Sequence, residues 1–123
     1  MAATSIVTYL GDLRTSSVHL QSGCVNITDA PLDNHGKGEA FSPTDTVANA
    51  LATCMFSIMG IKARDLDVNL DGSTAEVTKT MQADPRMIAK IEVVFTMNAD
   101  AGLKAKTILI KASNGALLGF FKK

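Results

Sequence analysis

The chain has 123 residues, 46% of them hydrophobic and 20% charged, a composition that fits one folded domain and excludes a disordered one. Its twelve basic and twelve acidic side chains cancel, so no electrostatic surface for nucleic acid or an anionic membrane is expected. One tyrosine and no tryptophan leave little aromatic surface on which bases could stack.

The sequence shows no segment typical of export or of a membrane span. Residues 1–10 lack the basic start and apolar run of a signal peptide. The longest apolar stretch, Val47–Ile61, is interrupted by polar residues and is shorter than the about 20 residues that a span requires. Two cysteines are too few for a secreted scaffold held by disulfides. We therefore expect a cytoplasmic protein without a membrane partner.

The N-terminal part of the chain predicts a three-stranded β-meander. Ser5–Leu10 is rich in β-branched residues, and Arg14–Leu20 is a second candidate strand. The dipeptide Ser22-Gly23 is a turn signal before the third candidate, Cys24–Thr28. Ala30–Gly38, with its glycines and a proline, is expected to be a loop.

A long buried helix is predicted next. Ser42 can cap it, Pro43 suits its first position, and Asp45 falls three residues after Ser42, as in a carboxylate form of the capping box. The stretch that follows, up to Ile61, is apolar on nearly every face, as in a helix at the centre of a domain. The helix should end within residues 60–65.

Three further strands and a second helix are predicted after it. The strands are Val68–Leu70, Ala75–Met81 and Lys90–Met97, the last with the alternation of a sheet packed on one face. Leu103–Ala112 reads as a helix. Strands, helix, strands and helix in this order indicate a single α+β domain spanning residues 1–123.

Two apolar elements are too large for a lone monomer of this size to cover. One is the all-round apolar helix, and the other is the tail Ala116–Phe121. We therefore expect a second copy of the chain to cover them, in a homodimer.

Cys54 lies on the predicted buried helix and has two readings. It could be a reactive thiol delivered into a sheltered pocket, or a small hydrophobe in the core, which the spacing alone favours. A reactive thiol needs a nearby cation, because a free thiol with a pKa near ~8.5 is mostly protonated at neutral pH. Arg14, between two predicted strands, is the best candidate, although the sequence alone favours a solvated turn arginine.

No cofactor or metal site is predicted. His19 and His35 are isolated, without the paired spacing of zinc ligands. Gly36-Lys37-Gly38 lacks the spacing of a phosphate-binding loop. Cys24, at the start of a predicted strand, is interpreted as structural.

Three segments together resemble the OsmC/Ohr family. The specific one runs from Ser42-Pro43-Thr44-Asp45 to Ala52-Thr53-Cys54-Met55, which is similar to that family's central helix. Supporting segments are Val7–Arg14 and Ile27–Pro31 in the meander. The resemblance covers about residues 6–112.

The resemblance implies a cysteine-based peroxidase that reduces organic hydroperoxides and forms an intertwined homodimer with its active sites at the subunit interface. It implies that Cys54 is the peroxidatic cysteine and that Arg14 stabilises its thiolate. The family's glutamate ten residues before the cysteine is replaced here by Thr44, so Glu39 or Asp45 is the possible partner of Arg14.

The family's resolving cysteine, in a Thr-Cys-Pro-Val motif, has no counterpart in the corresponding stretch, Ser113–Leu118. The sequence therefore predicts a peroxidase that works with one cysteine and an external thiol reductant. The alternatives are a non-catalytic protein of the same fold that binds a small apolar ligand in the interface pocket, and a structural relic with no ligand.

Overall fold

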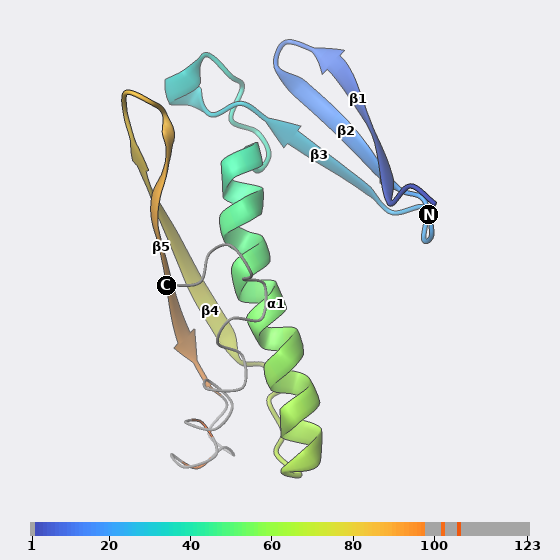
Figure 1. Ribbon diagram of the computed structural model, residues 1–123, viewed down its shortest axis with the longest axis vertical. Helices are drawn as coiled ribbons and strands as arrows, with labels where there is room; N and C mark the ends of the chain where they lie inside the picture. Colours follow the sequence, from blue (N-terminus) through green and yellow to red (C-terminus); the bar gives the residue numbers. More distant parts are fainter. Residues whose placement is uncertain (1, 98–101, 103–105, 107–123) are drawn as a thin grey trace. The chain divides into compact units, whose positions relative to one another are not determined.

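The computed structural model describes residues 2–97, 102 and 106, and in it the chain forms two compact units, residues 1–47 and 48–123 (Figure 1). The first unit holds strands β1 (Ser5–Gly11), β2 (Arg14–His19) and β3 (Val25–Asp29) and a short 3₁₀ helix, η1 (Leu32–Asn34). Helix α1 (Pro43–Asp65) begins in the first unit and continues into the second, which also contains β4 (Thr74–Gln82) and β5 (Met87–Thr96).

The first unit is the predicted antiparallel meander, with strand order β1-β2-β3. Its register places Ile6 opposite Val18 and Val18 opposite Val25. Residues that face each other across antiparallel strands lie on the same side of the sheet. One face of the meander is therefore largely apolar, and it ends at the pair formed by Arg14 and Asp29.

The turn before Arg14 has an unusual backbone. Asp12 and Leu13 have φ values of 53° and 63°, the positive range of a tight hairpin turn and uncommon for a leucine. Leu13 uses both of its backbone groups, because its N–H donates to the hydroxyl of Tyr9 and its carbonyl accepts from the N–H of Ala30. The turn is thus tied to β1 on one side and to the end of β3 on the other.

The loop after β3 folds back on itself and returns the chain to β3. The N–H of Gly36 donates to the carbonyl of Pro31, and the N–H of Asp29 donates to the carbonyl of Phe41. Gly36 lies so close to the carbonyl of Ala30 that a Cβ there would overlap it. This compact path brings residue 39 beside residue 29.

Helix α1 begins with the predicted capping box. The N–H of Asp45 donates to the Ser42 hydroxyl at 3.0 Å, and the N–H of Ser42 donates to the Asp45 carboxylate at 3.0 Å. The Ser42 residue is buried, so these bonds satisfy polar groups that water does not reach.

Only one stripe of α1 is buried, although the helix is apolar all round. The buried residues are Ala48, Ala52, Met59 and Ala63. Phe56, on the same side, meets Phe95 of β5 edge to face, with ring centroids 5.0 Å apart. By length and composition α1 could cross a membrane, but the core helix of a soluble protein meets the same test, so this is weak evidence.

The structure corrects one predicted strand, Val68–Leu70. Asp67 has a φ of 54°, and the N–H groups of Asp67 and Val68 donate to the carbonyls of Arg64 and Ala63. This is the Schellman closure of a helix C-terminus. Val68 and Leu70 are apolar because they pack against Met59 and Ala63, and not because they belong to a sheet.

The other two predicted strands are confirmed as β4 and β5, which pair in an antiparallel sheet beside α1 (Figure 1). Half-buried residues alternate with exposed ones along both strands, except where the register shifts and Ala89 and Lys90 of β5 are both exposed. The predicted α+β class is confirmed, and the single domain and the dimer stay predictions. The predicted helix Leu103–Ala112 (apart from Lys106) and the tail Ala116–Phe121 lie outside the described residues.

The overlap at Gly36 generates a stability prediction. Gly36→Ala should lower the free energy of unfolding by about 2–3 kcal/mol, because the loop backbone must move away from Ala30. Gly23→Ala is the matched control. Its positive φ of 76° should lower the free energy of unfolding by about 1 kcal/mol once a Cβ is present, but the added Cβ meets no other atom within 4 Å. Urea denaturation of both variants measures the difference, and equal losses would contradict the overlap.

Candidate functional site

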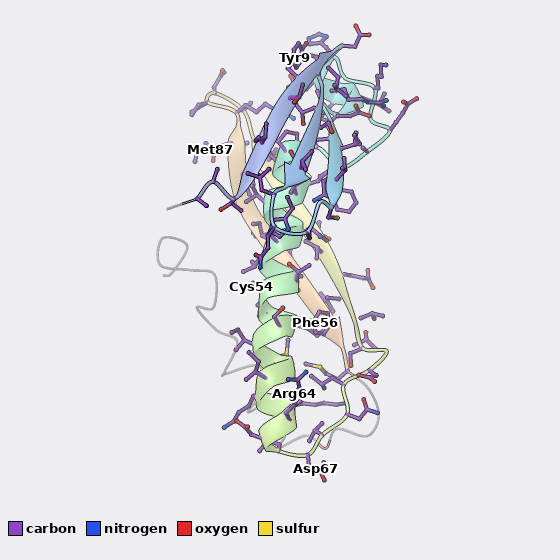
Figure 2. The ribbon with its side chains drawn as sticks, turned by 90° about the vertical axis from the view of Figure 1, so that its right-hand side faces the viewer. Tyr9, Cys54, Phe56, Arg64, Asp67 and Met87 are labelled. Atoms are coloured by element: carbon purple, nitrogen blue, oxygen red, sulfur yellow. The ribbon has the colours of Figure 1, made fainter. Side chains whose placement is uncertain are left out.

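Cys54 lies on the side of α1 opposite the core of the second unit. At 100° per residue, Cys54 is turned about 160° away from Phe56, which contacts β5 (Figure 2). It is half-buried and its sulfur is a free thiol. The buried stripe of α1 therefore does not include Cys54.

The helix face that carries Cys54 is largely apolar, with the exposed Ser57 at one edge and Asp65 at its C-terminal end. Leu51, Ile58 and Ile61 lie within about 60° of Cys54 around the helix axis. Ile61 is 60% exposed, and the other two are half-buried. A thiol on such a face gains an apolar environment as soon as another surface covers the face.

Arg14 is held by a carboxylate that the sequence analysis missed. Asp29 lies opposite Arg14 across β2 and β3, and its two oxygens accept from Nε at 2.7 Å and Nη2 at 2.8 Å. Such a two-bond pair fixes the plane of the guanidinium as well as its distance. The Asp29 residue is 0% exposed, whereas the Arg14 side chain is 28% exposed.

Asp29 is itself fixed from the loop. Its Oδ2 also accepts from the backbone N–H of Glu39 at 3.1 Å, and its own N–H donates to Phe41. Among the described residues, no buried side-chain nitrogen or oxygen is left without a hydrogen bond. The burial of this carboxylate is thus matched by three hydrogen bonds to its oxygens.

Arg14 and Asp29 each shift the pKa of the other. The hydrogen bonds from Arg14 hold the pKa of Asp29 below its usual value of 3.8, although desolvation opposes that shift. The pKa of Arg14 is raised further above its usual value, first by the hydrogen bonds to Asp29 and then by that to Glu39. Both groups are charged throughout the physiological range.

The two N–H groups of Arg14 Nη1 are not used by either carboxylate. Nη2 also donates to Oε1 of Glu39 at 2.7 Å, so Asp29 and Glu39 take up the hydrogens of Nε and Nη2. Nη1 has no hydrogen-bond partner among residues 2–97. Because two carboxylates face one cation, the cluster has a formal excess of one negative charge, and Arg14 can act on a ligand mainly through directed N–H groups.

Of the two predicted partners of Arg14, the structure brings one to it. Glu39 meets Arg14, as the sequence analysis allowed, whereas Asp45 pairs with Ser42 at the start of α1. Cys54 belongs to the second unit, so its pairing with Arg14 stays a prediction. The signal for Asp29 was present in the sequence, because a hairpin around Ser22-Gly23 that pairs Val18 with Val25 also pairs residue 14 with residue 29.

The remaining candidates form no second site. His19 contacts the hydroxyl of Ser22 through Nδ1, and Cys24 is exposed beside it with a free thiol. The described part of the chain holds no group of three or more side chains that could bind a metal ion. A half-open cavity of about 300 Å³ lies between the last turns of α1 and residues 68–71, but Cys54 does not line it.

The chain belongs to the OsmC family: the family pattern described as OsmC-like protein matches residues 36–116, which include α1 and Cys54. A solved structure from Psychrobacter arcticus, assigned provisionally as an osmotic stress induced and detoxification response protein, is 53% identical. Its TM-score is 0.88, and the match covers 92% of this chain and 82% of that one. The predicted family is confirmed.

More distant structures share the fold alone. An OsmC-like protein from Mycoplasma pneumoniae is 14% identical with a TM-score of 0.75, over 98% of this chain and 92% of that one. An organic hydroperoxide resistance protein OsmC from Legionella pneumophila is 17% identical with a TM-score of 0.60, over 92% and 83%. No curated protein matches the chain.

The lowered pKa of Asp29 predicts how its contribution to stability depends on pH. Asp29→Asn should be less stable than the wild type at neutral pH, because Arg14 loses its charged acceptor. A carboxylate with a depressed folded-state pKa stabilises the fold above its unfolded value and loses this effect as pH falls through the folded value. The stability gap should therefore hold from pH 7 to about 5 and close below about pH 4.

Urea titrations at a series of pH values measure this gap. Glu76→Gln, on the exposed face of β4, is the control and should show almost no gap at any pH. A gap for Asp29→Asn that persists unchanged at the lowest pH would contradict the assigned shift.

Proposed function

We propose that this protein is a thiol-dependent peroxidase that reduces organic hydroperoxides through Cys54. The observation that carries the proposal is the OsmC-like match over residues 36–116, which includes the helix that presents Cys54. The name of the fold relative from Legionella pneumophila, an organic hydroperoxide resistance protein, agrees with this chemistry. As a protein of this family it is proposed to act in the cytoplasm.

The proposed reaction is a two-electron transfer from sulfur to the peroxide. The thiolate of Cys54 attacks the distal oxygen of the hydroperoxide, an S–O bond forms, and the O–O bond breaks. The leaving alkoxide takes a proton and departs as the alcohol, while Cys54 becomes a sulfenic acid. Peroxide is reduced by two electrons and the sulfur is oxidised by two.

The sulfenic acid is then reduced from outside the chain. Cys24 is the only other cysteine in the sequence, and it lies in the turn before β3. An external thiol condenses with the sulfenic acid, releases water and forms a mixed disulfide. A second external thiol attacks that disulfide and returns Cys54 to its starting state.

In this proposal Arg14 supplies hydrogen bonds where negative charge resides. Its Nη1 hydrogens are open among the described residues, so they can donate to the thiolate before the reaction and to the developing alkoxide during it. Fixed donors need no reorganisation as the charge moves from sulfur to oxygen, and this lowers the barrier.

The one-cysteine mechanism predicts a specific labelling pattern. After one equivalent of cumene hydroperoxide with dimedone present, mass spectrometry should show a dimedone adduct on Cys54 and unmodified Cys24. Cys54→Ser should abolish the adduct, and Cys24→Ser should leave it unchanged. With an excess of a dithiol, the wild type should consume peroxide over many turnovers.

Two results would contradict this proposal in different ways. An internal Cys24–Cys54 disulfide would exclude the one-cysteine mechanism. Absence of oxidation at Cys54 would exclude the peroxidase, and a small apolar compound that raises the melting temperature would then favour the ligand-binding alternative.

The active form is proposed to be a homodimer. Neighbours in a strand point to opposite faces of the sheet. Strand β1 therefore exposes apolar side chains on both faces of the meander, namely Ile6, Val7, Tyr9 and Leu10. Ile61, on the α1 face that carries Cys54, is 60% exposed as well. A second copy of the chain would remove these surfaces from water and shelter the thiol.

Sedimentation velocity tests the dimer. The wild type should sediment as a dimer at micromolar concentration, and Ile61→Glu should shift it toward the monomer, because a carboxylate would be buried without a partner. Thr78→Glu, on the exposed face of β4, is the matched control and should leave the dimer intact. A monomeric wild type would contradict the shared interface.

A further inference from the structure

The two carboxylates on Arg14 differ in burial and in geometry. Asp29 is 0% exposed and makes two parallel bonds to the guanidinium, whereas the Glu39 side chain is 68% exposed and makes one. A solvated side chain with one bond exchanges it for water at little cost, but a buried carboxylate with two bonds does not. The position of Arg14 is therefore set by Asp29.

The position of Asp29 is in turn set by backbone groups. It ends β3, its N–H donates to Phe41, and its carboxylate accepts from the N–H of Glu39. The Glu39 backbone thus supports Asp29 even when the Glu39 side chain is changed. A substitution at Glu39 that spares its N–H separates the role of the exposed carboxylate from that of the buried one.

Asp29 also determines which edge of the guanidinium is free. By occupying Nε and one hydrogen of Nη2, it turns the opposite edge, with Nη1, away from β3. If Arg14 were held by Glu39 alone, the guanidinium could rotate about its own bonds, and no single donor would have a fixed direction.

We propose that Asp29 is the positioning residue of the peroxidase: it fixes the Arg14 guanidinium and with it the direction of the open Nη1 hydrogens, on which the reaction at Cys54 depends, while the Glu39 side chain is dispensable for this. The inference rests on the proposed function and assigns to it a residue that touches neither thiol nor peroxide. Misplaced donors cost rate, because catalysis of this kind depends on alignment.

The test compares two rates at Cys54 in four proteins: wild type, Asp29→Asn, Glu39→Gln and Arg14→Lys. The first is the second-order rate of oxidation by cumene hydroperoxide, followed by dimedone labelling. The second is the rate of alkylation by iodoacetamide at the same pH, a reaction with no peroxide oxygen to orient. A variant that merely loosens the fold exposes the thiol to both reagents and raises both rates together, whereas lost positioning lowers the oxidation rate alone, so the ratio of the two rates reports positioning.

Asp29→Asn should lower this ratio by about tenfold or more, as should Arg14→Lys, which cannot make the two-bond pair. Glu39→Gln should stay within about threefold of the wild type. A ratio for Asp29→Asn equal to that of the wild type, with Arg14→Lys impaired, overturns the inference. A loss in Glu39→Gln equal to that in Arg14→Lys also overturns it, even if Asp29→Asn fails to fold. No oxidation of wild-type Cys54 rejects the proposed function itself.

Discussion

The buried ion pair between Arg14 and Asp29 is the interaction on which the first unit depends. It closes the end of the β2–β3 ladder, anchors the returning loop through the N–H of Glu39, and sets the direction of the guanidinium. Removing Arg14 would leave the Asp29 carboxylate without its cation in a place that water does not reach, which is costly. The fold of residues 1–47 and the chemistry proposed for Arg14 therefore share one constraint.

The sequence predicted the features that depend on local rules. The capping box at Ser42 and Asp45, the meander and the alternation in β5 follow from spacing and turn residues, and the structure has all three. The strand predicted at Val68–Leu70 was wrong, because these residues belong to the turn that closes the C-terminus of α1. That closure depends on a positive φ at Asp67, which composition does not reveal. Asp29 was missed because its partner is distant in sequence and follows only from the register.

Cys54 shows the limit of reading one chain in isolation. The hydrophobic pattern correctly places Cys54 on a long apolar helix, but two different faces of that helix are apolar. One stripe packs inside its own unit, and the face with Cys54 points away from that core. Hydropathy cannot distinguish a surface buried within a chain from one reserved for another surface, because both need the same side chains.

Among the described residues, both sheets pair only strands that are neighbours in sequence: β1 with β2, β2 with β3, and β4 with β5. Short loops make such pairings fast, because little chain entropy is lost before contacts form. Every described partner of Asp29, from Arg14 to Phe41, lies before α1, so the ion-pair cluster contains no residue of that helix. The direction of the guanidinium is thus determined without any residue of the helix that carries the thiol.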